Sequence, residues 1–453
     1  MAHIVPFRAL RYDPSRVDLS QVVTQPYDKI TPELRDRYYA ASPFNLVRII
    51  LGKREPTDGA SNNPYSRAAH FFENWRRQGV FLQDDQPSIY SYTQQFTAPG
   101  EKTPKERKGF IALGRIEDYS GNVVFRHEQT LAKPKADRLD LLRATRAHFG
   151  QLFMLFSDPS GEVDAQLSAS VTQPEISLND EYGVSHRVGK ISDPSPIELV
   201  RLKMRDKQLI IADGHHRYET ALNYRNERRA QAASAQAAPD QRLRSDPQRQ
   251  SSAEIAPYEL VMMTFINMDS PGLVILPTHR VVHSLAGFSP DSLRDKARQY
   301  FSVEEVDPSI DAARSVGILR EAGHAGTALL GVTADRAFLF DTAKTIGSTF
   351  LGSLSLRQQS LDVVQLHKCL LETVLGISEE AIREQHNIAY IRDAGEAMAR
   401  VRAGNANIAF LMNPVKMRQV RDIAFAGEVL PQKSTDFYPK LLSGLTIYPL
   451  ENL

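Results

Sequence analysis

Apolar residues recur at two different spacings in the N-terminal third of the chain. Between residues 65 and 78 they return every three or four positions and fall on one face of a predicted helix. Residues 89–96 instead alternate in the manner of a β-strand, and a turn over residues 99–104 leads to a partner strand at residues 110–116. This part is predicted to mix α and β structure.

The same alternation of element types continues towards the middle of the chain. Residues 139–149 and 163–171 have helical periodicity, and residues 152–156 are typical of a short buried strand. Ser192, Asp193 and Pro194 then predict the start of a further helix, because Ser and Asp satisfy free N–H groups and Pro tolerates the first turn. A new unit is expected to begin here.

Residues 226–257 interrupt the pattern. Ala, Gln, Ser, Arg and Asp dominate the segment, and large apolar side chains are too few to offset the entropy of ordering it. We interpret it as a mobile insertion, after which residues 260–266 and 273–276 resume as strands and residues 289–300 as a helix. Strands and helices alternate to residue 413, and a loop-rich tail follows.

The predicted fold class is α+β, with multi-unit mixed sheets and helices. At 453 residues the chain exceeds what one core usually organises. We expect an N-terminal region at 1–191, a central unit at 192–287 and a C-terminal region at 288–453.

Charge and cysteine content narrow the function classes. Lys and Arg total 55 against 54 Asp and Glu, so no overall field recruits nucleic acid or an anionic membrane, and any anion site must be local. The single cysteine, Cys369, excludes a disulfide framework and is expected to be a buried helix thiol. Neither a signal-peptide core nor an apolar run of about 20 residues is present, which predicts a cytoplasmic protein.

The strongest candidate site is the run Asp213-Gly214-His215-His216-Arg217. It follows the apolar, strand-favouring residues 209–212 and precedes residues 216–224, which have helical character. A strand, a glycine turn and a helix start present free N–H groups and the positive end of a helix dipole, an arrangement that favours a phosphate. His215 and His216 can shuttle protons, and Arg217 can clamp phosphate oxygens.

A structural interpretation of this run stays open. Asp213 can simply cap the helix while Gly214 makes the turn and the remaining residues form a solvated polar end. The two adjacent histidines lack metal-ligand spacing, so no metal site is predicted. Neither a P-loop nor a dinucleotide-binding glycine fingerprint is present.

A second cluster runs from Arg126 through His127, Glu128 and Thr130 to residues 133–138. Glu128 can act as a general base towards a hydroxyl, with Lys135 and Arg138 compensating phosphate charge. An ion-paired surface loop is the alternative. Three smaller groups offer cationic, hydroxyl or acid/base side chains, although turn chemistry also explains them: residues 25–28, 277–280 and 431–435.

Long motifs in these segments resemble the bacterial and archaeal domain-of-unknown-function family number one thousand and fifteen. The resemblance runs from near the N-terminus to the end of the chain, but residues 226–257 have no place in it. The family label itself implies no activity. The motifs that carry it are Asn45-Leu46-Val47-Arg48, His127-Glu128, Pro134-Lys135-Ala136-Asp137-Arg138-Leu139, the stretch from Ile211 to Leu222, Leu276-Pro277-Thr278-His279-Arg280 and Pro431-Gln432-Lys433-Ser434-Thr435.

The Asp-Gly-His-x-Arg run also resembles, more distantly, the nucleotide-binding turn of ParB/sulfiredoxin-like domains, including archaeal free serine kinases. This resemblance implies that Gly214, His215, His216 and Arg217 hold nucleotide phosphates in the central unit. Sulfiredoxins have a cysteine where this chain has His215, which argues against sulfinic acid reduction. No basic recognition helix supports DNA binding.

The predicted function is a phosphotransferase that uses ATP or ADP with Mg²⁺ and acts on a small hydroxyl metabolite, with free serine or phosphoserine as the first candidate. Glu128, His127 and His216 are the predicted catalytic residues. The residues predicted to bind the nucleotide are Asp213, Gly214, His215, His216, Arg217, Lys135 and Arg138. A phosphatase using His215 or His216 as acid/base, and a nucleotide-responsive binding module without turnover, stay open. The expected partner is a small-molecule substrate, and neither nucleic acid nor a membrane is expected.

Overall fold

The computed structural model describes residues 2–129, 132–171, 173–237 and 255–451. The chain divides into two compact units. The first comprises Met1–Arg126, Thr130–Leu273 and Pro439–Leu453, and the second comprises His127–Gln129 and Val274–Tyr438. This grouping differs from the three consecutive segments predicted above, because the chain leaves the first unit twice and its C-terminal tail returns to it.

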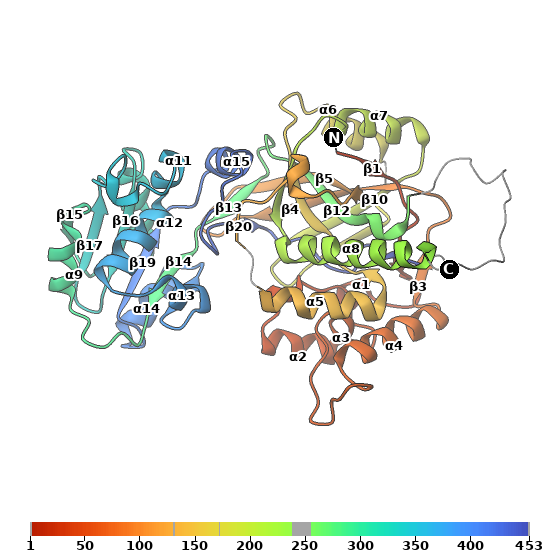
Figure 1. Ribbon diagram of the computed structural model, residues 1–453, viewed down its shortest axis with the longest axis horizontal. Helices are drawn as coiled ribbons and strands as arrows, with labels where there is room; N and C mark the ends of the chain where they lie inside the picture. The colour runs from red at the N-terminus through yellow and green to blue at the C-terminus, as the bar shows by residue number, and fades with distance from the viewer. Residues whose placement is uncertain (1, 130–131, 172, 238–254, 452–453) are drawn as a thin grey trace. The chain divides into compact units, whose positions relative to one another are not determined.

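The first unit is built on a mixed sheet that has nine strands in the described part of the chain (Figure 1). The strand order is β6-β11-β8-β12-β5-β4-β10-β9, and β1 pairs with β5. The pairing is mainly antiparallel, with parallel pairs between β11 and β6 and between β12 and β8. The strands are β1 (Ile4–Val5), β4 (Ile89–Thr97), β5 (Pro104–Arg115), β6 (Val124–Phe125), β8 (Leu152–Phe156), β9 (Ile176–Asn179), β10 (Ser185–Ile191), β11 (Leu209–Asp213) and β12 (Leu260–Asn267).

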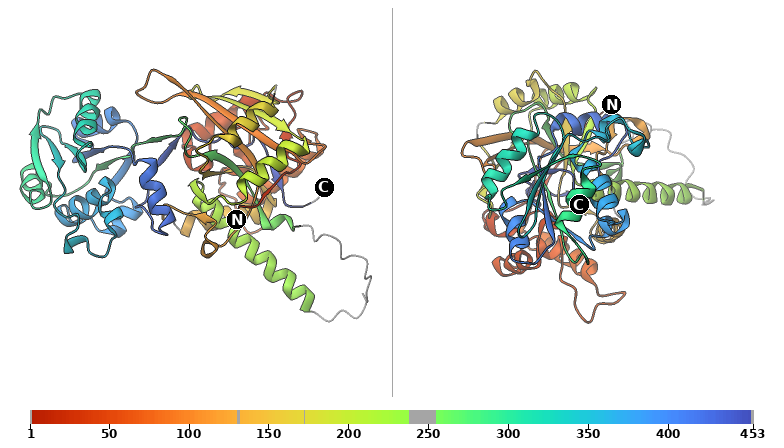
Figure 2. Two further views of the ribbon diagram at one scale, coloured as in Figure 1. Left: turned by 90° about the horizontal axis from the view of Figure 1, so that it is seen from above. Right: turned by 90° about the vertical axis from the view of Figure 1, so that its left-hand side faces the viewer.

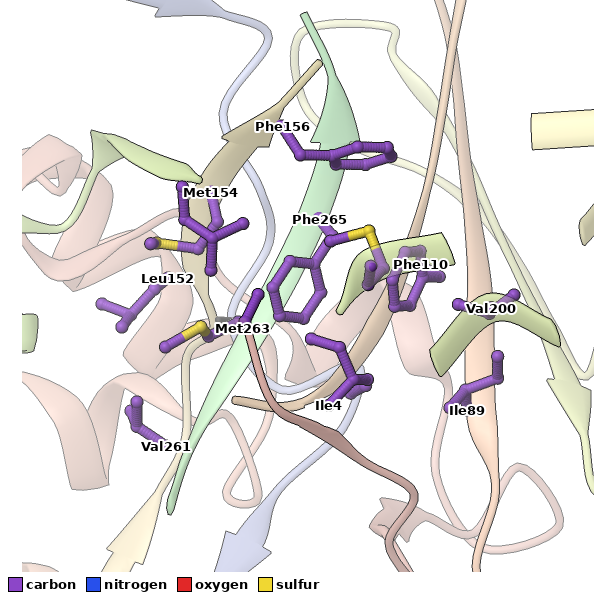
Figure 3. Packing of buried hydrophobic residues seen from close by; sticks show 14 of the residues in the cluster. Ile4, Ile89, Phe110, Leu152, Met154, Phe156, Val200, Val261, Met263 and Phe265 are labelled. Carbon is purple, nitrogen blue, oxygen red and sulfur yellow. The ribbon is translucent and has the colours of Figure 1, made fainter. Parts of the chain in front are cut away.

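One face of this sheet carries the main apolar core (Figure 3). Alternate residues of the central strands, such as Leu152, Met154 and Phe156 of β8, point into it because side chains alternate across a strand. Three helices cover this face: α6 (Glu162–Ser170), α7 (Pro194–Met204) and α8 (His215–Ala237). The core therefore fixes α8 against β8 and β11.

A second apolar cluster lies under the N-terminal helices and includes Phe72, Trp75 and Phe149. Here α4 and α5 pack side by side, and α5 also packs on α8. The elements of this layer are β2 (Leu10–Tyr12), α1 (Leu19–Val22), the short 3-10 helix η1 (Tyr27–Lys29), α2 (Pro32–Ala41), α3 (Val47–Ile50), α4 (Pro64–Arg77), β3 (Phe81–Gln83), α5 (Ala132–Thr145), β7 (Ala147–His148) and β21 (Tyr448–Pro449).

The second unit has its own six-stranded sheet, of order β15-β17-β16-β19-β14-β18, and its own core. A separate pair, β13 with β20, completes it (Figure 1). Figure 2 shows the same chain from two further sides. The elements are β13 (Val274–Leu276), β14 (His279–Val282), α9 (Pro290–Ala297), β15 (Ser302–Val306), α10 (Ala312–Ala322), β16 (Ala328–Val332), β17 (Ala337–Asp341), α11 (Leu356–Gln359), α12 (Asp362–Gln365), a π-helix (Leu366–Val374), α13 (Glu379–Glu384), β18 (Ile388–Ile391), α14 (Ala394–Arg402), β19 (Ile408–Met412), α15 (Met417–Phe425) and β20 (Asp436–Tyr438).

The predicted α+β class is confirmed, and so are the helix near residues 65–78 and the strand pair that follows it. Cys369 is buried in the π-helix, and burial raises the pKa of its thiol to about 11, which agrees with an inert structural role.

The predicted insertion is wrong at its start, because residues 226–237 continue α8. Ala, Arg and Glu favour a helix even where apolar residues are scarce. Ion pairs to other segments also hold this part, including Arg229 to Glu259 at 2.5 Å and Glu227 to Arg143 at 2.5 Å. Residues 238–254 of the predicted insertion lie outside the described residues.

Candidate functional site

The Asp213–Arg217 run forms the strand-to-helix turn that its pattern predicts. β11 ends at Asp213, Gly214 takes φ +95°, and α8 begins at His215. A Cβ atom at Gly214 would lie 3.0 Å from both Leu152 Cδ2 and the Arg217 guanidinium. Backbone conformation and close packing therefore both favour glycine at this position.

Asp213 is the centre of a partly buried ionic cluster. Arg217 Nη2 donates to its Oδ2 at 2.8 Å, and Lys440 Nζ donates to its Oδ1 at 3.2 Å. Burial on its own would raise the pKa of Asp213, but the charges of Lys440, Arg217 and Lys29 outweigh it and hold that pKa well below its usual range. Asp213 is thus an ionised anchor for two cations.

Lys440 belongs to the C-terminal tail of the chain, which packs beside the Asp213 carboxylate. On the sheet face opposite the main core, Gln94 Nε2 donates to the Lys440 carbonyl at 2.9 Å, and Arg107 Nη2 donates to the Pro439 carbonyl at 2.5 Å. Arg107 is fully buried and stacks on Phe153, and burial lowers its pKa to about 9. Sequence reasoning missed Lys440, because its lone position in the tail carries no local signal.

His215 and His216 form the first turn of α8 and are both half-buried. Arg217, one position further on, also donates through Nη1 to the Gln151 carbonyl at 2.8 Å. This second bond, with the Asp213 ion pair, fixes the guanidinium beside the turn. Arg217, predicted as a phosphate ligand, therefore already has a carboxylate partner.

Lys135 and Arg138 of α5 also belong to the first unit, and each has an internal partner. Lys135 Nζ lies 2.8 Å from Glu219 of α8. Arg138 pairs with the adjacent Asp137, donates to the Ile50 carbonyl at 2.6 Å, and stacks over the Tyr27 ring at 4.2 Å. A phosphate at either cation would have to displace or share these contacts.

A small cavity opens beside the turn. It has a volume of about 80 Å³, and its polar lining includes Tyr27, Arg138, Arg217 and Ser443. Burial raises the pKa of Tyr27 to about 12, so this hydroxyl stays protonated and able to donate. The segment 25–28, predicted only as a minor candidate, thus supplies a wall of the cavity, and Ser443 is a further residue that sequence reasoning missed.

His127 and Glu128 belong to the second unit, where they bind the loop before β20. His127 Nε2 lies 2.8 Å from Thr435 Oγ1, and the His127 carbonyl accepts from Leu430 N at 2.8 Å. Glu128 Oε1 accepts from Lys433 N at 2.7 Å. Two motifs that are about 300 residues apart therefore form one structural cluster; Thr130, the end of the predicted run, lies outside the described residues.

Arg280 joins the same cluster. Its side chain is buried, stacks over Tyr390 at 4.9 Å, and donates through Nη2 to the Lys433 carbonyl at 3.0 Å. Burial lowers the pKa of Arg280 to about 10, against the opposing charges of Tyr390 and Glu128. The segments 277–280 and 431–435, predicted as separate candidates, thus meet around Arg280.

The predicted site residues are therefore shared between the two units. Asp213, Gly214, His215, His216, Arg217, Lys135 and Arg138 lie in the first unit, whereas His127 and Glu128 lie in the second. Within the described residues, no group of three or more His, Cys, Asp or Glu side chains is placed to hold a metal ion. No described helix is both long and apolar enough to cross a membrane.

The family model described as "Protein of unknown function (DUF1015)" matches residues 4–364. No curated protein matches the chain. A solved structure of a conserved hypothetical protein from Pyrococcus furiosus shares 10% identity at a TM-score of 0.34, covering 72% of this chain and 92% of that one. A solved structure of a free serine kinase in complex with AMP shares 10% sequence identity at a TM-score of 0.33, covering 71% of this chain and 89% of that one. The structure of SbnI with a C-terminal truncation, from Staphylococcus aureus, shares 9% sequence identity at a TM-score of 0.34, covering 75% of this chain and 87% of that one.

Proposed function

Because the chain belongs to the DUF1015 family, whose function is unknown, we propose from the site alone that its first unit binds nucleotide phosphates at the Gly214 turn and transfers a phosphoryl group to a small hydroxyl metabolite. The observation that carries the proposal is the start of α8: a glycine turn, two histidines and a fixed arginine at the end of a 23-residue helix, beside a cavity.

Electrostatics at the turn favour an anion. The first N–H groups of a helix have no partner within the helix, and the helix dipole places partial positive charge at the same point. Lys29, Arg217 and Lys440 interact with Asp213, so three cations surround one carboxylate there. The excess positive charge, together with the backbone N–H groups, suits a phosphate.

The cavity suits the transferred group rather than a whole nucleotide. Its volume of about 80 Å³ is small, and Tyr27 and Ser443 bring hydroxyl groups to its wall next to Arg217. Phosphoryl transfer needs positioning and charge stabilisation more than covalent help from the protein. Fixed donors around a small cavity are the type of structure that supplies both.

The donor we propose is ATP or ADP with Mg²⁺, and the motif's resemblance to free serine kinases makes L-serine the first acceptor to test. Purified protein mixed with Mg²⁺, L-serine and ATP, ADP or pyrophosphate in turn should form phosphoserine, measured by mass spectrometry. His216→Ala should lose this product. His70→Ala is the matched control, because His70 is exposed on α4 of the same unit and its Nε2 lies 2.8 Å from Nδ2 of Asn74, away from the turn.

Each outcome of that experiment selects a function. Product formed by the parent and the control but not by His216→Ala supports the phosphotransferase and identifies its donor. Nucleotide binding that needs His216 but gives no product points to a binding module without turnover. Release of inorganic phosphate from a phosphorylated metabolite without nucleotide selects the phosphatase.

The role of Glu128 as general base stays a prediction, and two substitutions separate it from a structural role. Glu128→Gln keeps an oxygen that accepts from Lys433 N, so stability should change by less than about 0.5 kcal/mol while turnover falls about 100-fold or more. Glu128→Ala should in addition lose about 1 kcal/mol of stability. Turnover that survives undiminished in Glu128→Gln would remove Glu128 from the mechanism.

A further inference from the structure

A second and larger cavity lies in the first unit, next to the one at the turn. Its volume is about 530 Å³, within the range of small-molecule sites. It is lined by α2, by α3 and the residues after it, by the start of α4, and by α5. Ile50, Arg138 and Leu141 line both cavities, so the two are neighbours that share a wall.

Charged residues dominate the polar lining of this larger cavity. Four cations, Arg35, Lys53, Arg54 and Arg138, face two carboxylates. Lys53 pairs with Asp36 at 2.6 Å, and Arg138 pairs with Asp137. Two arginines therefore remain in excess.

Those two arginines act on neighbouring carboxylates only through longer-range charge, Arg35 on Asp36, and Arg54 on Asp58 and Asp137. Among the described residues, neither Arg35 nor Arg54 forms an ion pair with a carboxylate. Arg35 Nε is also buried and has no hydrogen-bond partner in the described structure. Buried donors are normally satisfied, so an unpaired guanidinium N–H beside a cavity needs an explanation, and a bound acceptor supplies one.

We propose that this cavity binds a small metabolite with at least two oxyanion groups, held by Arg35 and Arg54. Guanidinium groups recognise carboxylates and phosphates through paired hydrogen bonds. The cavity has room for a metabolite larger than serine. The binding site stands on its own, but naming its ligand as the phosphoryl acceptor rests on the proposed function, because Arg138 separates the ligand from the cavity at the Gly214 turn.

Carboxylates and phosphates share the chemistry that this site recognises, so both are tested. Citrate and pyrophosphate are titrated into the full-length protein by calorimetry, with an Arg35→Gln/Arg54→Gln double variant, Arg217→Gln, and Arg77→Gln as the control. Arg77 is exposed at the end of α4 and pairs with Glu73 of the same helix at 3.2 Å. Arg35 is half-buried and Arg54 is exposed, so folding, checked by circular dichroism, should be retained.

We expect the double variant to weaken binding of at least one probe about tenfold or more, while Arg77→Gln leaves it unchanged. The probe that binds tells whether carboxylates or phosphates occupy the cavity. Pyrophosphate binding that is lost only in Arg217→Gln belongs to the Gly214 turn and would not support this site. No binding of either probe, or equal binding in the double variant and the parent, overturns the proposal. Neither result depends on phosphoserine formation, so the two proposals fail separately.

Discussion

Replacing Asp213 by alanine should lower the free energy of unfolding of the first unit by up to about 3–5 kcal/mol, since removing one member of a largely buried ion pair leaves its partners uncompensated. Here two cations, Arg217 and the nearly buried Lys440, would lose their common carboxylate. The only tryptophan, Trp75, lies in the core of this unit, so its fluorescence during urea denaturation reports the loss.

Glu73→Ala is the matched control for Asp213→Ala. Glu73 pairs with Arg77 at 3.2 Å on the exposed face of α4, where solvent screens the charges, and its loss should cost less than about 1 kcal/mol. Equal effects of the two substitutions would show that the ionic cluster at Asp213 does not hold the turn together.

The same cluster predicts the pH dependence of stability. Because its cations hold the pKa of Asp213 below that of an unfolded carboxyl, about 3.9, its contribution is complete above that pH and is lost as the pH falls. Acid titration of Trp75 fluorescence should therefore show a stability loss below about pH 4 that is smaller in Asp213→Asn. An identical acid profile in the two proteins would contradict this assignment.

Gly214→Ala should destabilise the first unit by about 3 kcal/mol and abolish phosphate binding at the turn. The positive φ of 95° costs an L-residue about 1–2 kcal/mol, and contacts of 3.0 Å to Leu152 and Arg217 add an overpacking term of about 1–3 kcal/mol. Denaturation followed by Trp75 fluorescence measures the first effect, and calorimetric titration with pyrophosphate measures the second.

Gly183→Ala separates the two costs. Gly183 also has a positive φ, of 76°, but no atom lies within 4 Å of the position that its Cβ would take. Only the backbone cost of about 1–2 kcal/mol should appear, with pyrophosphate binding intact. If Gly214→Ala behaves like Gly183→Ala in both measurements, close packing at the turn has no part in the site.

Local sequence signals were enough to locate the strand-to-helix turn at Asp213–Arg217. The apolar run before Asp213, the glycine and the helical spacing after His216 each concern neighbouring residues, and the structure has β11, Gly214 and α8 in those places. Local composition gave a wrong prediction for one segment, the start of the expected insertion. Residues 226–237 lack large apolar side chains, yet helix propensity and ion pairs from distant segments extend α8 through them.

The partners of the charged residues could not be predicted in the same way. Lys135 and Arg138 were expected to meet phosphate, but the fold places Glu219 and Asp137 beside them. Glu128 was expected to act as a base, and the fold places its carboxylate against the backbone N–H of Lys433, 305 positions further along the chain.

By itself the sequence determined the α+β class, the strand–glycine–helix turn and the family motifs, because periodicity, backbone freedom and capping act between residues that are close in the chain. Only the tertiary structure decided that Lys440 neutralises Asp213, that three motifs meet around Arg280, and that Arg35 and Arg54 face a cavity. Charges interact through space, so the function of each cation depends on which carboxylate or cavity the fold brings to it.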